Sequence, residues 1–119
     1  NNVKIYRNFL KDNSIPKENL FFPEEKIHEK SSYVMFIGLC RKRDLLQKFL
    51  NSKGIQTLVY YGTPLHLHPA SKKFGYKIGD FPKAEAICNK VLAFPHHQHL
   101  KKKHIEFVCD NIKKFYNKY

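Results

Sequence analysis

Apolar residues recur every three or four positions in four segments of the chain, which is the spacing of an amphipathic helix. These segments are residues 1–12, 43–53, 82–91 and 105–116. The second predicted helix ends at Gly54, because glycine readily takes the left-handed conformation that follows many helices. Asp80 precedes the third and is predicted to cap it, with Pro82 in its first turn.

Three shorter segments rich in apolar, β-branched or aromatic residues predict strands. Residues 33–40 form a nearly uninterrupted apolar run, which is typical of a strand buried on both faces. Residues 55–61 predict a second strand, which ends at the Gly-Thr-Pro of residues 62–64. Residues 91–94 predict a third, which Pro95 ends.

Strands that alternate with amphipathic helices in a chain of 119 residues predict an α+β fold. We expect a small two-layer α/β sandwich, in which helices cover one face of a three- to four-stranded sheet. Connections through helices would be right-handed wherever the strands run parallel. Residues 13–31 and 65–79 show no apolar period, and we expect a connecting loop and an irregular segment there.

The chain carries 22 Lys and Arg against 10 Asp and Glu, which gives a formal net charge of +12. Nineteen of the 22 are lysines, and they are scattered through every segment. Proteins that read nucleic acids depend on arginine and on interleaved aromatic residues. A solvated lysine-rich surface is therefore favoured over a nucleic-acid interface, although the charge still attracts small anions.

Size and cysteine content limit the possible settings of the chain. The longest apolar run is far shorter than the roughly 20 residues that span a bilayer, so we expect no membrane association. Cys40, Cys88 and Cys109 lie far apart in apolar surroundings, which predicts buried free thiols in a reducing compartment, the cytoplasm.

A chain of this size forms one core but no large cleft, so a sizeable active site would need a second domain or a partner. The N-terminal residues show no targeting signal, and the chain looks like a piece of a longer protein.

Two histidine clusters could carry chemistry. His66 and His68 would lie on one side of an extended segment, and His96-His97-Gln98-His99 follows the third predicted strand. Three such ligands suit tetrahedral zinc. No carboxylate that could orient them lies close by in sequence, so histidines at a polar surface or a substrate edge are favoured over a metal site. No nucleophile elbow or phosphate-binding glycine loop is present.

Residues 54–69 read Gly-Ile-Gln-Thr-Leu-Val-Tyr-Tyr-Gly-Thr-Pro-Leu-His-Leu-His-Pro. This segment strongly resembles a signature of the DegT/DnrJ/EryC1/StrS family of PLP-dependent nucleotide-sugar aminotransferases, which runs Gly-Ile-x-Thr, then His-Tyr-Pro-x-Pro-x-His, then Pro. Four further segments are similar to family motifs in the same order, and together the five cover nearly the whole chain. Residues 32–36 are similar to the family motif Ser-Tyr-His-Leu-Tyr, and residues 43–45 to the motif Arg-Asp-x-Leu. Residues 81–85 are similar to the motif Pro-x-Ala-Glu, and residues 92–95 to the motif Leu-Ser-Leu-Pro.

The resemblance implies the C-terminal small domain of the family, which has the aspartate-aminotransferase-like fold of fold-type I PLP transferases. Residues 1–30 would be the end of a linking helix plus a connecting loop, and residues 31–119 the small domain. PLP is the implied cofactor of the full-length parent, held by a large domain that supplies the Schiff-base lysine and the aspartate at the pyridine nitrogen. For this chain alone the resemblance implies no catalytic, cofactor-binding or metal-binding residue and no activity.

Position by position, the resemblance implies substrate contacts from Tyr60, Tyr61, Thr63 and His66. Phenol, hydroxyl and imidazole groups can hydrogen-bond the hydroxyls or the diphosphate of a sugar nucleotide. Tyr60 stands where the motif has His, and Gly62 where it has Pro. The alternative for the two tyrosines is ordinary packing on the faces of the sheet.

The implied reaction of the parent is transfer of an amino group from glutamate to a keto sugar carried on a nucleoside diphosphate, for amino-sugar or polysaccharide biosynthesis, by a homodimer. Two other functions stay open on the residues alone. One is a basic domain that binds nucleic acid through lysine–phosphate contacts, and the other is a metal-binding domain built on the histidine clusters.

Overall fold

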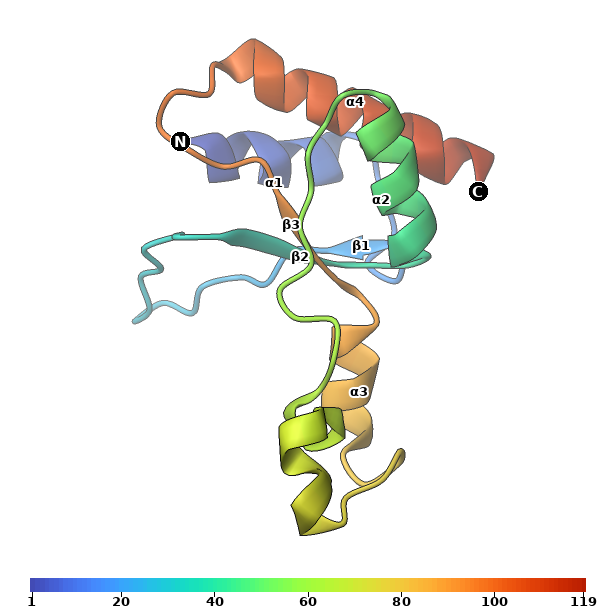
Figure 1. Ribbon diagram of the computed structural model, residues 1–119. Coiled ribbons are helices and arrows are strands. Elements are labelled where there is room, and N and C mark those ends of the chain that lie inside the picture. The colour runs from blue at the N-terminus through green and yellow to red at the C-terminus, as the bar shows by residue number, and fades with distance from the viewer.

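In the computed structural model, which describes residues 1–119, helices cover one face of a sheet and a separate arm projects away from the other (Figure 1). Four α-helices are present, as the sequence predicts, together with three strands, two of which lie within predicted strands. The α-helices are α1 (Asn2–Asp12), α2 (Arg43–Ser52), α3 (Pro82–Cys88) and α4 (Lys102–Lys118); the strands are β1 (Leu20–Phe21), β2 (Phe36–Cys40) and β3 (Val91–Phe94); and two 3-10 helices are η1 (Leu65–Leu67) and η2 (Pro69–Phe74).

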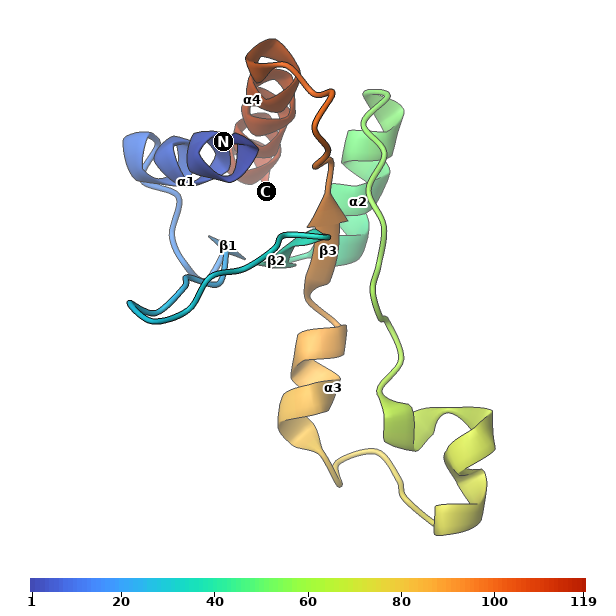
Figure 2. The ribbon, with the colours of Figure 1, turned by 90° about the vertical axis from the view of Figure 1, so that its left-hand side faces the viewer.

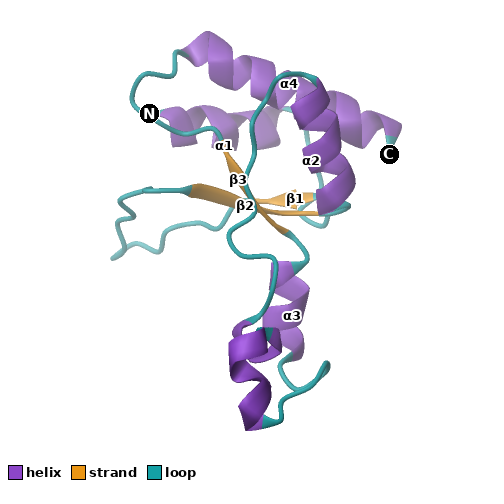
Figure 3. Ribbon diagram, viewed as in Figure 1, coloured by secondary structure: helices purple, strands orange, loops and turns teal.

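The three strands form one sheet in the order β1-β2-β3, and both pairs are antiparallel. Leu20 lies opposite Cys40, and Ile37 lies opposite Ala93. Helices α1, α2 and α4 lie on one face of this sheet (Figure 3). The α+β class and the two-layer sandwich with a three-stranded sheet are therefore confirmed.

One predicted strand and one predicted loop are wrong. Residues 55–61 form no strand, because only Leu58 pairs with β3, through one bridge to Ala93, before the chain turns out into the arm. Conversely, residues 13–31 are not all loop, since β1 lies within them. A strand of two residues is too short to produce an alternating pattern that sequence inspection could detect.

Strand β2 begins at Phe36, three residues later than predicted, and its burial alternates along the strand. Phe36, Gly38 and Cys40 are buried against the helices, whereas Ile37 and Leu39 are half-buried. The prediction of burial on both faces is wrong, because the helices cover only one side of the sheet.

The core lies between the sheet and the helices, and the predicted apolar stripes of α1, α2 and α4 supply most of it. Its 17 residues include Val3 and Tyr6 of α1, Leu46 and Leu50 of α2 and five residues of α4. The five core residues of α4 are Ile105, Val108, Cys109, Ile112 and Phe115.

Gly54 follows α2 with a φ of +77°, the left-handed conformation that its predicted role at the end of this helix requires.

Residues 61–90, here called the arm, carry η1, η2 and α3 away from the sandwich (Figure 2). No residue of α3 is buried, so its predicted apolar stripe does not pack on the core, and Cys88 is only half-buried instead of buried. Cys40 and Cys109 are buried, and all three thiols are free. Asp80 does not cap α3, because its carboxylate accepts a hydrogen bond from the Lys77 N–H at 2.9 Å and Phe81 takes the N-cap position.

None of the helices combines the length and the apolar character that crossing a membrane requires.

Candidate functional site

The four residues that the resemblance implies as substrate contacts, Tyr60, Tyr61, Thr63 and His66, line one hollow at the base of the arm. This arm hollow has a volume of about 750 Å³ and lies between η1, the segment before it, and α3. Its walls are mostly apolar. The other lining residues are Pro64, Leu65, His68, Phe81, Ala84, Ile87, Cys88 and Val91.

The two tyrosines lie at the mouth of the arm hollow and not in the core of the sandwich. Tyr61 is 70% exposed and Tyr60 is half-buried, and their ring centroids are 5.6 Å apart. Residues 55–61 form no strand, and the Tyr61 ring is mostly exposed, whereas Tyr60 also lines a second hollow together with Ala93 and Phe94 of β3. Thr63 is also exposed, so the phenol of Tyr61 and the hydroxyl of Thr63 are both available to a ligand.

His66 lies inside the arm and forms the inner wall of the hollow. Its side chain is 6% exposed, and its ring centroid lies 4.8 Å from that of Phe81 and 6.5 Å from that of Tyr76. His66 Nε2 has no hydrogen-bond partner and lies 3.8 Å from the Glu85 carboxylate. Any contact of His66 with a ligand would therefore be made through the hollow.

Glu85 connects α3 to two other parts of the arm. Its carboxylate faces His66 of η1 and also accepts a hydrogen bond from the N–H of Gly79, in the loop before α3, at 2.8 Å. The sequence offers a signal for it, since Glu85 and Phe81 belong to the segment that resembles the Pro-x-Ala-Glu motif, but neither was predicted as a site residue. His68 Nε2 lies 3.1 Å from the Thr63 carbonyl oxygen, which fixes the turn between them.

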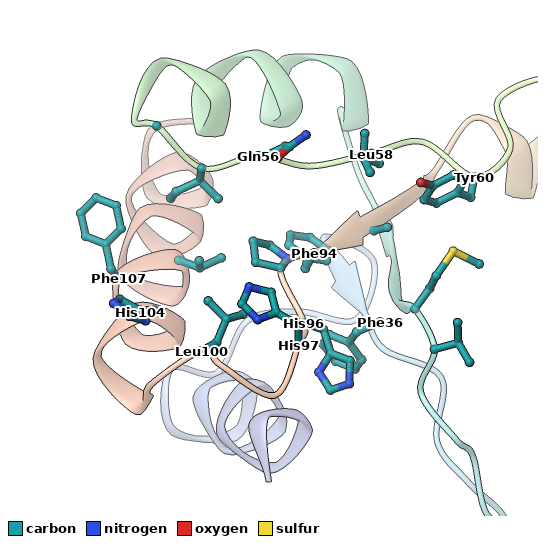
Figure 4. Close-up of a pocket in the computed structure, with 17 residues that line it drawn as sticks. Phe36, Gln56, Leu58, Tyr60, Phe94, His96, His97, Leu100, His104 and Phe107 are labelled. Carbon is teal, nitrogen blue, oxygen red and sulfur yellow. The ribbon is translucent and has the colours of Figure 1, made fainter.

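A second hollow, of about 620 Å³, lies between residues 54–60, the end of β3 and α4 (Figure 4). It contains the histidines His96, His97 and His104. Burial lowers the pKa of His96, with a further lowering from His97. His66 and His68 line the other hollow, so the two histidine clusters do not meet. No three His, Cys, Asp or Glu side chains form a group that could hold a metal ion.

All nineteen lysine side chains are exposed, and neither hollow is lined by a lysine. A lysine that forms a Schiff base with PLP has to point into a closed site beside the cofactor. The residues of this chain therefore do not by themselves fit a PLP site.

Comparison with known proteins places this geometry in a family. The model of the DegT/DnrJ/EryC1/StrS aminotransferase family matches residues 1–113. The chain belongs to this family.

Among curated family relatives, the chain is 36% identical over 108 residues to the erythromycin biosynthesis sensory transduction protein EryC1 of Saccharopolyspora erythraea, covering 91% of this chain and 28% of EryC1. It is 32% identical over 81 residues to dTDP-3-amino-3,4,6-trideoxy-alpha-D-glucose transaminase of Streptomyces venezuelae. This match covers 68% of this chain and 21% of the transaminase. The chain thus spans between a fifth and three tenths of the length of these relatives.

Solved structures of aminotransferases share the fold. DesV of S. venezuelae, solved with a ketimine intermediate, superimposes with a TM-score of 0.83 at 24% identity, covering 96% of this chain and 30% of DesV. A family aminotransferase from Brucella abortus gives a TM-score of 0.78 at 25% identity, with the same coverage. A sugar aminotransferase of Streptococcus pneumoniae has been solved in PLP and PMP forms. The fold of this chain is that of the aminotransferase small domain.

Proposed function

We propose that this chain is the C-terminal small domain of a PLP-dependent aminotransferase that acts on nucleoside-diphosphate-linked keto sugars with glutamate as amino donor. Residues 1–30 would be the end of the linking helix and a connecting loop, and residues 31–119 the small domain. The parent would be a cytoplasmic homodimer. The main support is family membership over residues 1–113, together with a relative named as a dTDP-sugar transaminase.

The arm hollow is the proposed substrate side of the site. The Tyr61 phenol and the Thr63 hydroxyl are exposed at its mouth and can donate to or accept from sugar hydroxyls and diphosphate oxygens. Tyr60 would lie beside them at the mouth, and His66 would form the inner wall. The arm carries five lysines against two carboxylates, so its field attracts an anionic diphosphate.

The chain is proposed to be incomplete and inactive alone. Bound PLP supplies the electron sink for transamination, and its lysine and aspartate partners would come from a large domain. The apolar surface of the arm supports this proposal. Of 14 exposed large apolar side chains, seven lie between Tyr61 and Ile87, as expected where another domain would cover them.

Incubation of the purified chain with PLP tests the proposed incompleteness. We expect no stable aldimine at a single lysine, because no lysine lies in a closed site. Borohydride should trap only weak, non-selective adducts spread over the exposed lysines. A stable adduct at one specific lysine, found by peptide mass spectrometry, would contradict the proposal. The gene upstream of Asn1 provides a second test, since the reading frame should continue into a PLP-binding large domain.

The substrate contacts are tested in the full-length product of that gene. Tyr61→Phe and Thr63→Val should each raise KM for the sugar nucleotide, because each removes one hydroxyl from the mouth of the hollow. The rate of the half-reaction with glutamate should not change. Tyr119→Phe, an exposed tyrosine on the other side of the sheet, is the matched control. A KM unchanged in both variants would refute the proposed contacts.

A further inference from the structure

The arm leaves the sandwich and returns to it through two short segments, and these are its only connections. The outgoing segment is residues 55–60. The returning segment is residues 88–91, which comprise the last three residues of the arm and the first residue of β3. No hydrogen bond or ion pair joins residues 61–87 to the sandwich. The direction of the arm therefore depends on how these two connecting segments are held.

Helix α2 contacts both connecting segments through two side chains. Gln47 Nε2 donates a hydrogen bond to the Thr57 carbonyl oxygen of the outgoing segment at 3.2 Å. Arg43 Nη1 donates to two carbonyl oxygens of the returning segment, Cys88 at 3.1 Å and Val91 at 2.9 Å. Arg43 and Gln47 lie four positions apart, so both side chains project from the same face of α2.

Arg43 is the stronger of the two contacts. Its side chain is 8% exposed, and its guanidinium is also paired with the Asp44 carboxylate at 2.6 Å, which compensates the buried charge. Hydrogen bonds from a charged, buried donor are stronger than neutral ones. The Cys88 carbonyl is at the C-terminal end of α3, so Arg43 attaches the arm helix directly to α2.

Backbone contacts hold the connecting segments in addition. The Ile55 N–H of the outgoing segment donates to the Leu50 carbonyl oxygen of α2 at 3.0 Å, and Val91 of the returning segment pairs with Leu39 in the sheet. Leu58 and Ala93 exchange two hydrogen bonds, of 3.2 and 2.7 Å, and the Cys40 N–H donates to the Lys90 carbonyl oxygen at 2.8 Å. None of these backbone contacts reaches α3, whereas Arg43 does. Without the two α2 side chains, only the backbone contacts would hold the connecting segments.

We propose that Arg43 and Gln47 are positioning residues that together fix the direction of the arm relative to the sandwich. By fixing the arm, they would also place Tyr61 and Thr63 toward the substrate, and this second part rests on the proposed function.

Residual dipolar couplings of the 119-residue chain test the first part, because they report the relative orientation of arm and sandwich. In the wild type, couplings from residues 65–88 and from the sandwich should fit one common alignment tensor. In Arg43→Lys/Gln47→Ala the arm should lose this common tensor and give a weaker alignment of its own. Lysine keeps the charge beside Asp44 but lacks the planar group that donates to two carbonyls.

Lys48→Ala, on the exposed side of α2, is the matched control and should keep the common tensor. Sandwich couplings that fit the wild-type structure show that the double variant is folded. If Arg43→Lys does not fold, Gln47→Ala alone, which changes a half-buried side chain, decides the question. Arm couplings that still fit the common tensor in the folded variant overturn the proposal.

The second part is tested in the full-length protein. Arg43→Lys should raise KM for the sugar nucleotide and leave the half-reaction with glutamate unchanged, a split that general destabilisation would not produce. Equal effects on the KM for the sugar nucleotide and on the half-reaction with glutamate would overturn the role of Arg43 in substrate positioning. A full-length protein with no transaminase activity would refute the proposed function, whereas the dipolar couplings of the chain would still decide whether α2 fixes the arm.

Discussion

Gly38 lies in the middle of β2, where two phenylalanine rings occupy the space that a side chain would need. A Cβ at this position would lie 2.8 Å from Phe22 Cε1 and 3.1 Å from Phe94 Cε2. Both rings are in the core and cannot move without displacing others. Gly38→Ala should therefore lower the free energy of unfolding by about 1–3 kcal/mol, measured by urea denaturation.

Gly62→Ala is the matched control for this prediction. Its added Cβ would meet only the Val59 side chain, at 3.3 Å, outside the sheet. We expect a smaller loss of stability there. Acting through the unfolded chain, Gly→Ala stabilises a protein, so a loss has to come from the folded state. Equal losses at the two positions would show that the two rings do not cause the loss at Gly38.

His96 makes the stability of the chain depend on pH, because burial lowers its pKa below the ordinary value of 6.5. Between the lowered and the ordinary pKa, the unfolded chain binds more protons at this residue than the folded chain does. The contribution of His96 is therefore fully present above pH 6.5 and is lost as the pH falls below it. Thermal denaturation at neutral and mildly acidic pH should show this loss.

His96→Gln should reduce the fall in melting temperature between the two pH values, whereas His97→Gln should not. His97 is the right comparison because it is adjacent and exposed. The same pH dependence in both variants and the wild type would mean that other groups cause it.

At the scale of elements, the period of apolar residues predicted the helices that pack on the sheet. In α2, the predicted stripe contains both Leu46, which is fully buried, and Leu45, which is 49% exposed. Leu46→Ala should lower the free energy of unfolding by about 2–5 kcal/mol because it leaves a cavity in the core. Leu45→Ala should cost far less, and chemical denaturation of the two variants makes the comparison. Similar losses would show that Leu45 packs as deeply as Leu46.

Elements that do not pack on the core were predicted less well, for physical reasons. The β-branched and aromatic residues of positions 55–61 suit a strand, but Tyr60 and Tyr61 lead into the arm hollow and leave the sheet. The apolar stripe of α3 is real, yet it faces the hollow and not the core. Periodicity shows that a face is apolar, and it does not show what covers that face.

At the scale of the whole molecule, the two-layer sandwich was predictable but the arm was not. Residues 65–79 show no period because η1 and η2 are short 3-10 turns. The resemblance identified Tyr60, Tyr61, Thr63 and His66, and only the structure showed that they share one hollow with α3. Whether these residues contact a substrate stays a prediction. The contacts that α2 makes with the two connecting segments could not be predicted. Gln47 binds a backbone carbonyl about ten positions further along the chain, and Arg43 binds one more than forty positions further along.

The projecting arm determines the size of the molecule in solution. The radius of gyration of the structure is 15.7 Å, whereas a compact chain of 119 residues should have about 13.5 Å. If α2 holds the arm outward, small-angle X-ray scattering of the monomer should give a value close to that of the structure.

The exposed apolar residues of the arm favour a more compact arrangement, because they would be buried if the arm folded back onto the sheet. Leu65 and Ile78 are 83% and 82% exposed. Replacing both with lysine removes the two most exposed of these side chains and should disfavour both the folded-back arrangement and self-association, so the double variant should give the radius of the extended arm. We expect the wild-type monomer to match it at high dilution. A wild-type radius nearer the compact value, with the variant remaining larger, would mean that the arm packs on the sheet when it is uncovered and is extended only against another domain.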